Sequence, residues 1–368
     1  MRRRSNAMRL AGTLSCPALC LALAAAPAAA QEAAGDTLEI YLVDVEGGEA
    51  TLFVAPSGES LLVDTGWPGF DGRDADRIAA AAADAGAAAI DHLIVTHFHG
   101  DHMGGAHQLA ERLPIGSFID HGTTVDEDER PLAAFARYVD LRESGEHVVA
   151  APGDRVPIEG LDVRIIASGG DVLDAPLPGA GGANRFCEGF TFHGEDITSR
   201  YGNAEDDQSI STFVGFGRFR TVIMGDLNWN REHDLMCPED RIGAIDLYLV
   251  SHHGSETSGS EALAPAIAPR AAVMNNGPRK GGAPQTFEIL RAAAAPPDIW
   301  QNHYSIPAGD LNAPEAFIAN LDEGVEMPDG RTVHMGQSHW IRISARRDGS
   351  FTVTNSRNGF TRDYPARQ

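Results

Sequence analysis

The sequence has few cysteines, few basic residues and no long hydrophobic run beyond its first thirty residues. Only four of the 368 residues are cysteine, and they match no zinc-binding spacing. Lysine and arginine number 29 against 52 acidic residues, and the formal net charge of −23 argues against a general nucleic-acid-binding surface. Beyond residue 30 no segment approaches the roughly eighteen apolar residues of a membrane helix. We therefore expect a soluble mature chain without a membrane span.

The first thirty residues have the pattern of a cleavable secretory signal peptide. Four arginines precede the apolar stretch LCLALAAAPAAA, which is too short to span a bilayer, and Ala30 ends an A-x-A cleavage site. We predict export, so that the protein is periplasmic or secreted. Cleavage would shift the formal net charge from −23 to −27, because the segment holds four arginines and no acidic residue. Of the cysteines only Cys187 and Cys237 would remain, as candidates for one disulfide in an oxidising compartment.

Short strands and helices alternate along residues 31–368, which we expect to form a single domain. Residues 38–45, 50–55 and 60–64 are β-rich runs separated by turn residues, and they predict an antiparallel meander. An alanine-rich helix from about Asp74 to Gly86 follows. Later strands and helices repeat this order, which favours two sheets packed face to face with helices outside. We also expect an irregular insertion at about 169–205 and a C-terminal β-hairpin at about 339–356.

Residues Thr96 to Gly105, THFHGDHMGG, crowd three histidines and an aspartate together directly after a buried strand. Imidazole and carboxylate together suit zinc, and also iron or manganese. Further candidate ligands stand at the ends of later apolar strands, Asp226 in TVIMGDL and the pair His252-His253 in LYLVSHHGS. This recurrence predicts a metal site. The cluster residues are His97, His99, Asp101 and His102.

The motifs THFHGDH, LLVDTG, VIMGD and VSHHGS, in this order, resemble those of the metallo-β-lactamase superfamily. Within it, DVEGGEATLF and SHHGS look like the soluble hydrolase domain attached to the competence DNA-uptake protein ComEC. The resemblance covers roughly residues 38–295. It implies an α+β fold, the four-layer αββα sandwich, with two divalent metal ions, zinc first and manganese or iron as alternatives.

The resemblance also implies a ligand set. His97 and His99 would hold one metal ion, and Asp226 would bridge to a second ion that Asp101, His102 and His253 hold. VSHHG aligns with the family's common V-P-G-H-G, so His253 is preferred to His252, which becomes an outer or substrate contact. Asp64 is expected to hydrogen-bond the metal loop.

Many family members carry one more histidine before the bridging aspartate, and no such motif is present here. The candidates for completing the first site are Asp207, His121 and His193; otherwise it has two protein ligands and water. The seven remaining histidines stand singly and are interpreted as structural or surface residues: His92, His107, His147, His233, His303, His334 and His339.

The implied chemistry is hydrolysis by a hydroxide held between two cations, with Asp101 orienting the water or handling its proton. The first substrate hypothesis is a phosphodiester or phosphate ester. A lactone or β-lactam, or a catalytically silent metal-binding protein, are the alternatives. Arg279 and Lys280, in the turn MNNGPRKGG, are candidates for gripping an anionic group, although a solvated turn explains them as well. The oligomeric state is left open.

Overall fold

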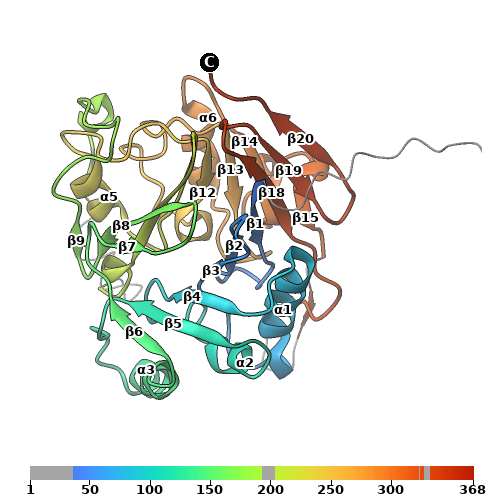
Figure 1. Ribbon diagram of the computed structural model, residues 1–368. Helices are drawn as coiled ribbons and strands as arrows, with labels where there is room; N and C mark the ends of the chain where they lie inside the picture. The colour runs from blue at the N-terminus through green and yellow to red at the C-terminus, as the bar shows by residue number, and fades with distance from the viewer. Residues whose placement is uncertain (1–35, 193–203, 323, 327–331) are drawn as a thin grey trace, which may run out of the picture. The chain divides into compact units, whose positions relative to one another are not determined.

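Two large sheets account for most of the strands (Figure 1). The structure is a computed structural model that describes residues 36–192, 204–322, 324–326 and 332–368; the predicted signal peptide and His193 lie outside them. The first sheet contains β1 (Thr37–Leu42), β2 (Thr51–Val54), β3 (Ser60–Val63), β4 (Ile90–Ile94), β5 (Ile115–Asp120), β6 (Glu146–Val149), β18 (Ile341–Arg346), β19 (Phe351–Asn355) and β20 (Thr361–Tyr364). The second contains β7 (Arg155–Val156), β8 (Asp162–Ser168), β9 (Asp171–Val172), β10 (Ser211–Phe216), β11 (Phe219–Ile223), β12 (Leu247–Leu249), β13 (Ala271–Met274), β14 (Asp298–His303) and β15 (Ile318–Asn320). The strands β16 (Val325–Glu326) and β17 (Thr332–Val333) form a separate pair.

Helices connect and cover these sheets. The α-helices are α1 (Arg73–Ala85), α2 (Ala106–Ala110), α3 (Glu129–Arg142), α5 (Trp229–Met236) and α6 (Pro284–Ala292). The 3-10 helices are η1 (Phe70–Gly72), η2 (Arg185–Cys187), η3 (Asp206–Gln208), η4 (Ser251–Gly254), η5 (Gly309–Leu311) and η6 (Glu315–Phe317).

Each sheet is part parallel and part antiparallel. The first has the order β20-β19-β18-β1-β2-β3-β4-β5-β6, antiparallel as far as β3 and parallel from β3 to β6. The second has the order β15-β14-β13-β12-β11-β10-β8-β7, parallel from β15 to β11 and antiparallel beyond, with β9 paired to β8. Figure 1 shows the early strand β1, in blue, beside the late strand β18, in red.

Three apolar clusters order the layers. One lies between the sheets and combines Phe53 of the first sheet with Phe219 and Trp300 of the second. A second packs α1, α2 and α3 against the first sheet, and a third packs α5 and α6 against the other sheet. The predicted αββα sandwich is therefore confirmed.

The local predictions agree with the structure only in part. The meander of β1, β2 and β3 is antiparallel as expected. The sequence from about Met103 to Arg112 also predicts a helix, but only α2 forms there, because residues up to Gly105 continue the turns of the histidine loop. Strand β14 has no counterpart among the predicted elements; its sequence DIWQNH is polar although its last five residues are buried. The C-terminal hairpin of β18 and β19 continues the first sheet, since β18 pairs with β1 and β19 with β20.

Cys187 and Cys237 are joined by a disulfide with an S–S distance of 2.00 Å. It links η2, in the irregular segment after β9, to the residue that follows α5. Among the described residues, no helix combines the length and the apolar character that crossing a bilayer requires.

Candidate metal centre

The histidine loop after β4 turns back on itself and gathers its side chains. A Cβ at Gly104 would collide with the Gly100 carbonyl oxygen, so the turn needs glycine there. His97 and His102 are buried, whereas the His99 side chain is 26% exposed. The Nε2 atom of His97 lies 2.9 Å from Nδ1 of His99. The loop thus presents a buried imidazole beside one that solvent reaches.

Asp64, expected to hydrogen-bond this loop, lies directly after β3 with a left-handed φ of 61°. Its carboxylate accepts hydrogen bonds from the amide and the hydroxyl of Thr96, each at 2.7 Å. It also lies 2.8 Å from Nδ1 of His102, which fixes that ring and leaves Nε2 facing the centre. A strained backbone held by such a network is typical of a functional site.

Asp226, three residues after β11, lies between histidines from both halves of the chain. Its Oδ2 atom is 3.2 Å from Nε2 of His102, 3.2 Å from Nε2 of His252 and 4.0 Å from Nε2 of His97. Its Oδ1 atom is 3.5 Å from Nε2 of His253. The Asp226 carboxylate therefore faces imidazoles of the histidine loop and of η4 at once.

Two adjoining sets of ligand atoms result, each with all its atoms within 4.8 Å of one another. A zinc ion bound at about 2.0–2.2 Å keeps its ligand atoms roughly 3.3 Å apart. In the second set Nε2 of both His102 and His253 lies 3.4 Å from Oδ2 of Asp101. Both nitrogens are buried without a hydrogen-bond partner in the described part of the chain. The spacing fits a cation in each set, namely His97, His99 and Asp206, and Asp101, His102, Asp226 and His253. The nitrogens without a partner support this for the second set.

Asp206, in η3, completes the first set and was missed by the sequence analysis. Its Oδ1 atom lies 3.0 Å from Nδ1 of His99 and 3.4 Å from Nε2 of His97. The proposed Asp207 instead accepts a hydrogen bond from Asn228. Successive residues of a 3-10 helix point about 120° apart, so one of two neighbouring aspartates faces the loop, and no sequence signal tells which.

His121 does not complete the first set either. Its Nε2 atom lies 2.9 Å from the carboxylate of Glu205, the residue before Asp206. That buried carboxylate also accepts hydrogen bonds from the amides of Phe98 and Val125 and from the hydroxyl of Thr124. The Glu205 carboxylate thus connects the segment of Asp206 to the histidine loop, and His121 helps to hold that carboxylate in place.

The neighbouring histidines of η4 have different roles. Both adopt left-handed backbone conformations, with φ of 51° for His252 and 54° for His253. His253 belongs to the second set, as expected. His252 faces the same aspartate with Nε2, while its Nδ1 lies 3.1 Å from the hydroxyl of Thr257 and 3.2 Å from that of Ser258. Its side chain is 16% exposed, so it borders the centre on the accessible side.

The electrostatics of the centre favour the binding of cations. Burial raises the pKa of the Asp226 carboxyl, but His102, His252 and His253 hold it well below its ordinary value. Burial lowers the pKa of His97 well below its ordinary value, and the neighbouring imidazoles lower it further. Burial also lowers the pKa of His102, but Asp226 and other carboxylates raise it well above the ordinary value. Cation and proton therefore compete for His102, whereas Asp226 and His97 already have the protonation state that metals bind.

Lys280 lies at the rim of the centre. Its ammonium group contacts Oδ2 of Asp101 and lies 5.1 Å from the ring centroid of Trp67. Its side chain is 37% exposed, and the neighbouring Arg279 is exposed too. Lys280 is the only lysine of the sequence.

An αββα sandwich that carries two adjoining histidine–carboxylate sets at the ends of its inner strands has the architecture of metal-dependent hydrolases. The chain belongs to the metallo-β-lactamase superfamily, whose family model matches residues 44–274, more than half of the chain. The comparison with curated proteins gave no match.

Solved structures with similar folds are distant. A diphosphatase of the PhnP family is 12% identical with a TM-score of 0.37, over 72% of this chain and 92% of that one. CmlA, a diiron β-hydroxylase from Streptomyces venezuelae, is 13% identical with a TM-score of 0.35, over 65% of this chain and 44% of that one. A Cronobacter sakazakii metallo-β-lactamase with an HARLDQ motif is 15% identical with a TM-score of 0.31, over 51% and 60%. The chain therefore spans less than two thirds of the latter two, and its family membership follows from the match over residues 44–274.

Proposed function

We propose that this protein is an exported hydrolase that uses two divalent cations, zinc first and manganese or iron as alternatives, to cleave phosphodiesters or phosphate esters. The observation that carries the proposal is the position of Asp226, within 3.2–4.0 Å of His97, His102, His252 and His253. Membership of the superfamily and the motif resemblance to the ComEC-like branch support it.

Some side chains of the centre would bind the cations, and others would contact the substrate. Two bound cations would supply Lewis acidity and lower the pKa of a water molecule so that it attacks an ester near neutral pH. Asp226 would contact the cations of both sets, and Asp101 would bind the second cation with His102 and His253 and orient the water or handle its proton. His252, held by Thr257 and Ser258, presents Nε2 from the accessible side and is placed to pass a proton to a leaving group.

A small anionic substrate fits the rim better than a neutral one. The ammonium of Lys280 lies next to Asp101 and is partly exposed, so a phosphate approaching the centre would meet a positive charge. The net charge of −23 leaves no general surface for a long nucleic acid. A small phosphate ester is therefore favoured over a polymer.

Export is supported by the leader-like residues 1–30 and by the disulfide of Cys187 and Cys237, a bond typical of oxidising compartments. Expression of the full chain in a bacterium, followed by cell fractionation and N-terminal sequencing, tests this part. Periplasmic or secreted protein beginning at Gln31 is expected. Cytoplasmic protein with an intact leader would refute it.

The catalytic proposal is tested with chromogenic phosphodiesters, phosphomonoesters, lactones and β-lactams, on protein whose metal content is measured. An Asp226→Ala preparation serves as the blank for contaminating hydrolases. Two equivalents of metal at the centre with phosphodiester or phosphate-ester turnover are expected. Turnover of only the lactone or β-lactam would overturn the substrate class, and bound metal without any turnover would overturn the assignment as a hydrolase.

A further inference from the structure

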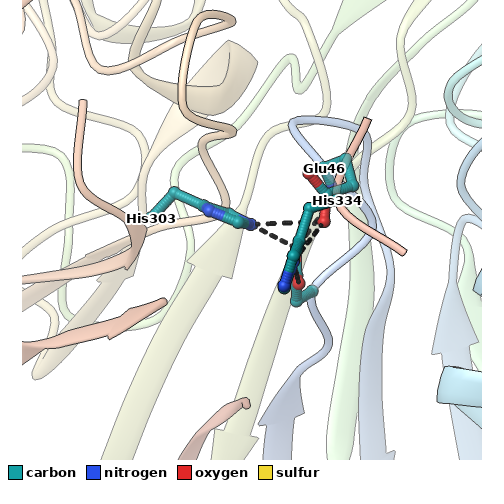
Figure 2. Close-up of side chains that lie close together, drawn as sticks. Glu46, His303 and His334 are labelled. Carbon is teal, nitrogen blue, oxygen red and sulfur yellow. Dashed lines mark hydrogen bonds and ion pairs between the residues drawn. The ribbon is translucent and has the colours of Figure 1, made fainter. Parts of the chain in front are cut away.

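A second gathering of histidines and carboxylates shares no residue with the centre described above. Asp44 and Glu46 belong to the turn between β1 and β2, His303 ends β14, and His334 follows β17. Three segments far apart in the sequence thus supply four side chains, and one ligand atom from each lies within 4.8 Å of the others. Figure 2 shows the His303 ring pointing toward Glu46 and His334.

The spacing of these atoms resembles that of the central sets. Nε2 of His303 lies 2.7 Å from Oδ1 of Asp44 and 3.6 Å from Oε1 of Glu46. Nδ1 of His334 lies 3.0 Å from Oε1 of Glu46 and 3.8 Å from Oδ2 of Asp44. These separations scatter around the roughly 3.3 Å expected between ligands of one zinc ion. None of the four side chains is more than 9% exposed.

Arg77 orients the two carboxylates from one side. Its Nη1 atom donates to Oδ2 of Asp44 at 2.9 Å and to Oε1 of Glu46 at 3.0 Å, and Nη2 donates to the His334 carbonyl at 3.1 Å. Metal-binding carboxylates are commonly held by such outer hydrogen bonds. One guanidinium balances only one of the two buried carboxylates, so the other needs a second positive charge, from an imidazolium or from a bound cation.

We propose that Asp44, Glu46, His303 and His334 bind a structural divalent transition-metal ion. Two imidazoles among four ligands favour zinc over calcium, which prefers six to eight oxygens. Four protein ligands close the coordination sphere, as in structural rather than catalytic zinc sites. The proposal does not rest on the hydrolase function.

The ion would fix the turn that borders the central site. Directly after Glu46, a Cβ on Gly47 would lie 2.8 Å from the amide nitrogen of Gly277, in the turn that carries Lys280. Two residues later, the amide of Glu49 donates to the Asp101 carbonyl at 3.1 Å. We call Asp44, Glu46, His303 and His334 the outlying cluster. An ion bound there would fix the connection between β1 and β2, which contacts the catalytic loop.

The test uses the full chain, stripped with a chelator, reloaded with zinc chloride and desalted before metal analysis by mass spectrometry. The unmodified protein should hold three zinc equivalents and His334→Gln two. His339→Gln is the matched control, on the same segment but outside the cluster, and should hold three. An anomalous-difference map at the zinc edge should show a peak between the four side chains.

Equal zinc content in the unmodified protein and in His334→Gln, or a map without this peak, would overturn the proposal. If the four side chains bind zinc but the histidine-loop centre does not, the unmodified protein should hold one equivalent and His334→Gln none. This result separates the structural metal site from the proposed function. Glu46→Gln, which keeps the shape of the side chain, should also lose one equivalent and replaces His334→Gln should that variant not fold. The map of the unmodified protein decides in either case.

Discussion

The central metal centre and the outlying cluster use similar side chains but balance their charge differently. In the outlying cluster Arg77 is buried and donates to both carboxylates. At the centre the basic residue Lys280 stands at the rim, partly exposed, and contacts Asp101 alone. Asp206 and Asp226 face imidazoles instead: Asp206 lies against His97 and His99, and Asp226 against His102, His252 and His253.

The two sites differ in where their fixed positive charge stands, between the carboxylates in the outlying cluster and at the rim in the centre. A guanidinium fixed between two carboxylates offsets part of their charge before any ion binds. At the centre the carboxylates face imidazoles, so a bound metal ion would compete there with protons. Four substitutions test this contrast, and they follow in order of decreasing effect.

Asp226→Ala should give the largest effect, because it removes the carboxylate that contacts both sets of ligands. We expect both central equivalents of metal to be lost and turnover to fall by about a thousandfold or more, since loss of Lewis-acid assistance costs several kcal/mol. Metal analysis and steady-state kinetics on the same preparation check this. Unchanged metal and turnover would refute the bridging role.

Arg77→Ala should destabilise the fold by about 3–5 kcal/mol, because it leaves two buried carboxylates without their fixed cation. Urea unfolding followed by circular dichroism measures the loss. Arg155→Ala is the control: Arg155 pairs with Asp162 at the surface and should cost at most about 1 kcal/mol. Equal losses in the two variants would contradict the role of Arg77 as the fixed cation of the two carboxylates.

Asp206→Asn should weaken metal binding at the first set by about 10- to 100-fold. This is the loss typical of mutating the groups that orient metal ligands. The neighbouring Asp207→Asn, which changes a carboxylate bonded to Asn228, should leave metal affinity unchanged. Competition with a chromogenic chelator measures both. The reverse order would return Asp207 to the place that the sequence analysis gave it.

Lys280→Ala should have the smallest effect, a rise of about tenfold in KM for a phosphate ester with little change in kcat, as expected when a charge at the rim aids binding only. For a neutral lactone KM should stay the same. Because Lys280 is the only lysine, reductive methylation labels just this side chain and the N-terminal amine, and the NMR signal of the labelled lysine should shift when phosphate binds. An unchanged KM and an unmoved signal would place the substrate elsewhere.

The histidine loop illustrates what could be predicted from the sequence. His97, His99, Asp101 and His102 are close in the chain, so a single turn after a strand is enough to gather them. The third ligand atom of the first set could not be assigned, because Asp206 and Asp207 differ only in the direction that η3 gives them.

His303 and His334 illustrate the opposite case. Each was interpreted as a single structural or surface histidine, yet both meet Asp44 and Glu46 over sequence separations of more than 250 residues. Nothing local marks such a meeting, since it depends on the pairing of β1 with β18 and on the place of β14 in the second sheet.

The layered fold and the motif loops could be predicted from the sequence, because strand periodicity, turn residues and ligand spacing act over a few neighbouring residues. The three-dimensional structure was needed to show which aspartate faces the metal loop, which basic residue stands by each cluster, and that a second cluster exists. Those outcomes follow from the packing of two sheets, which brings together side chains that no local pattern connects.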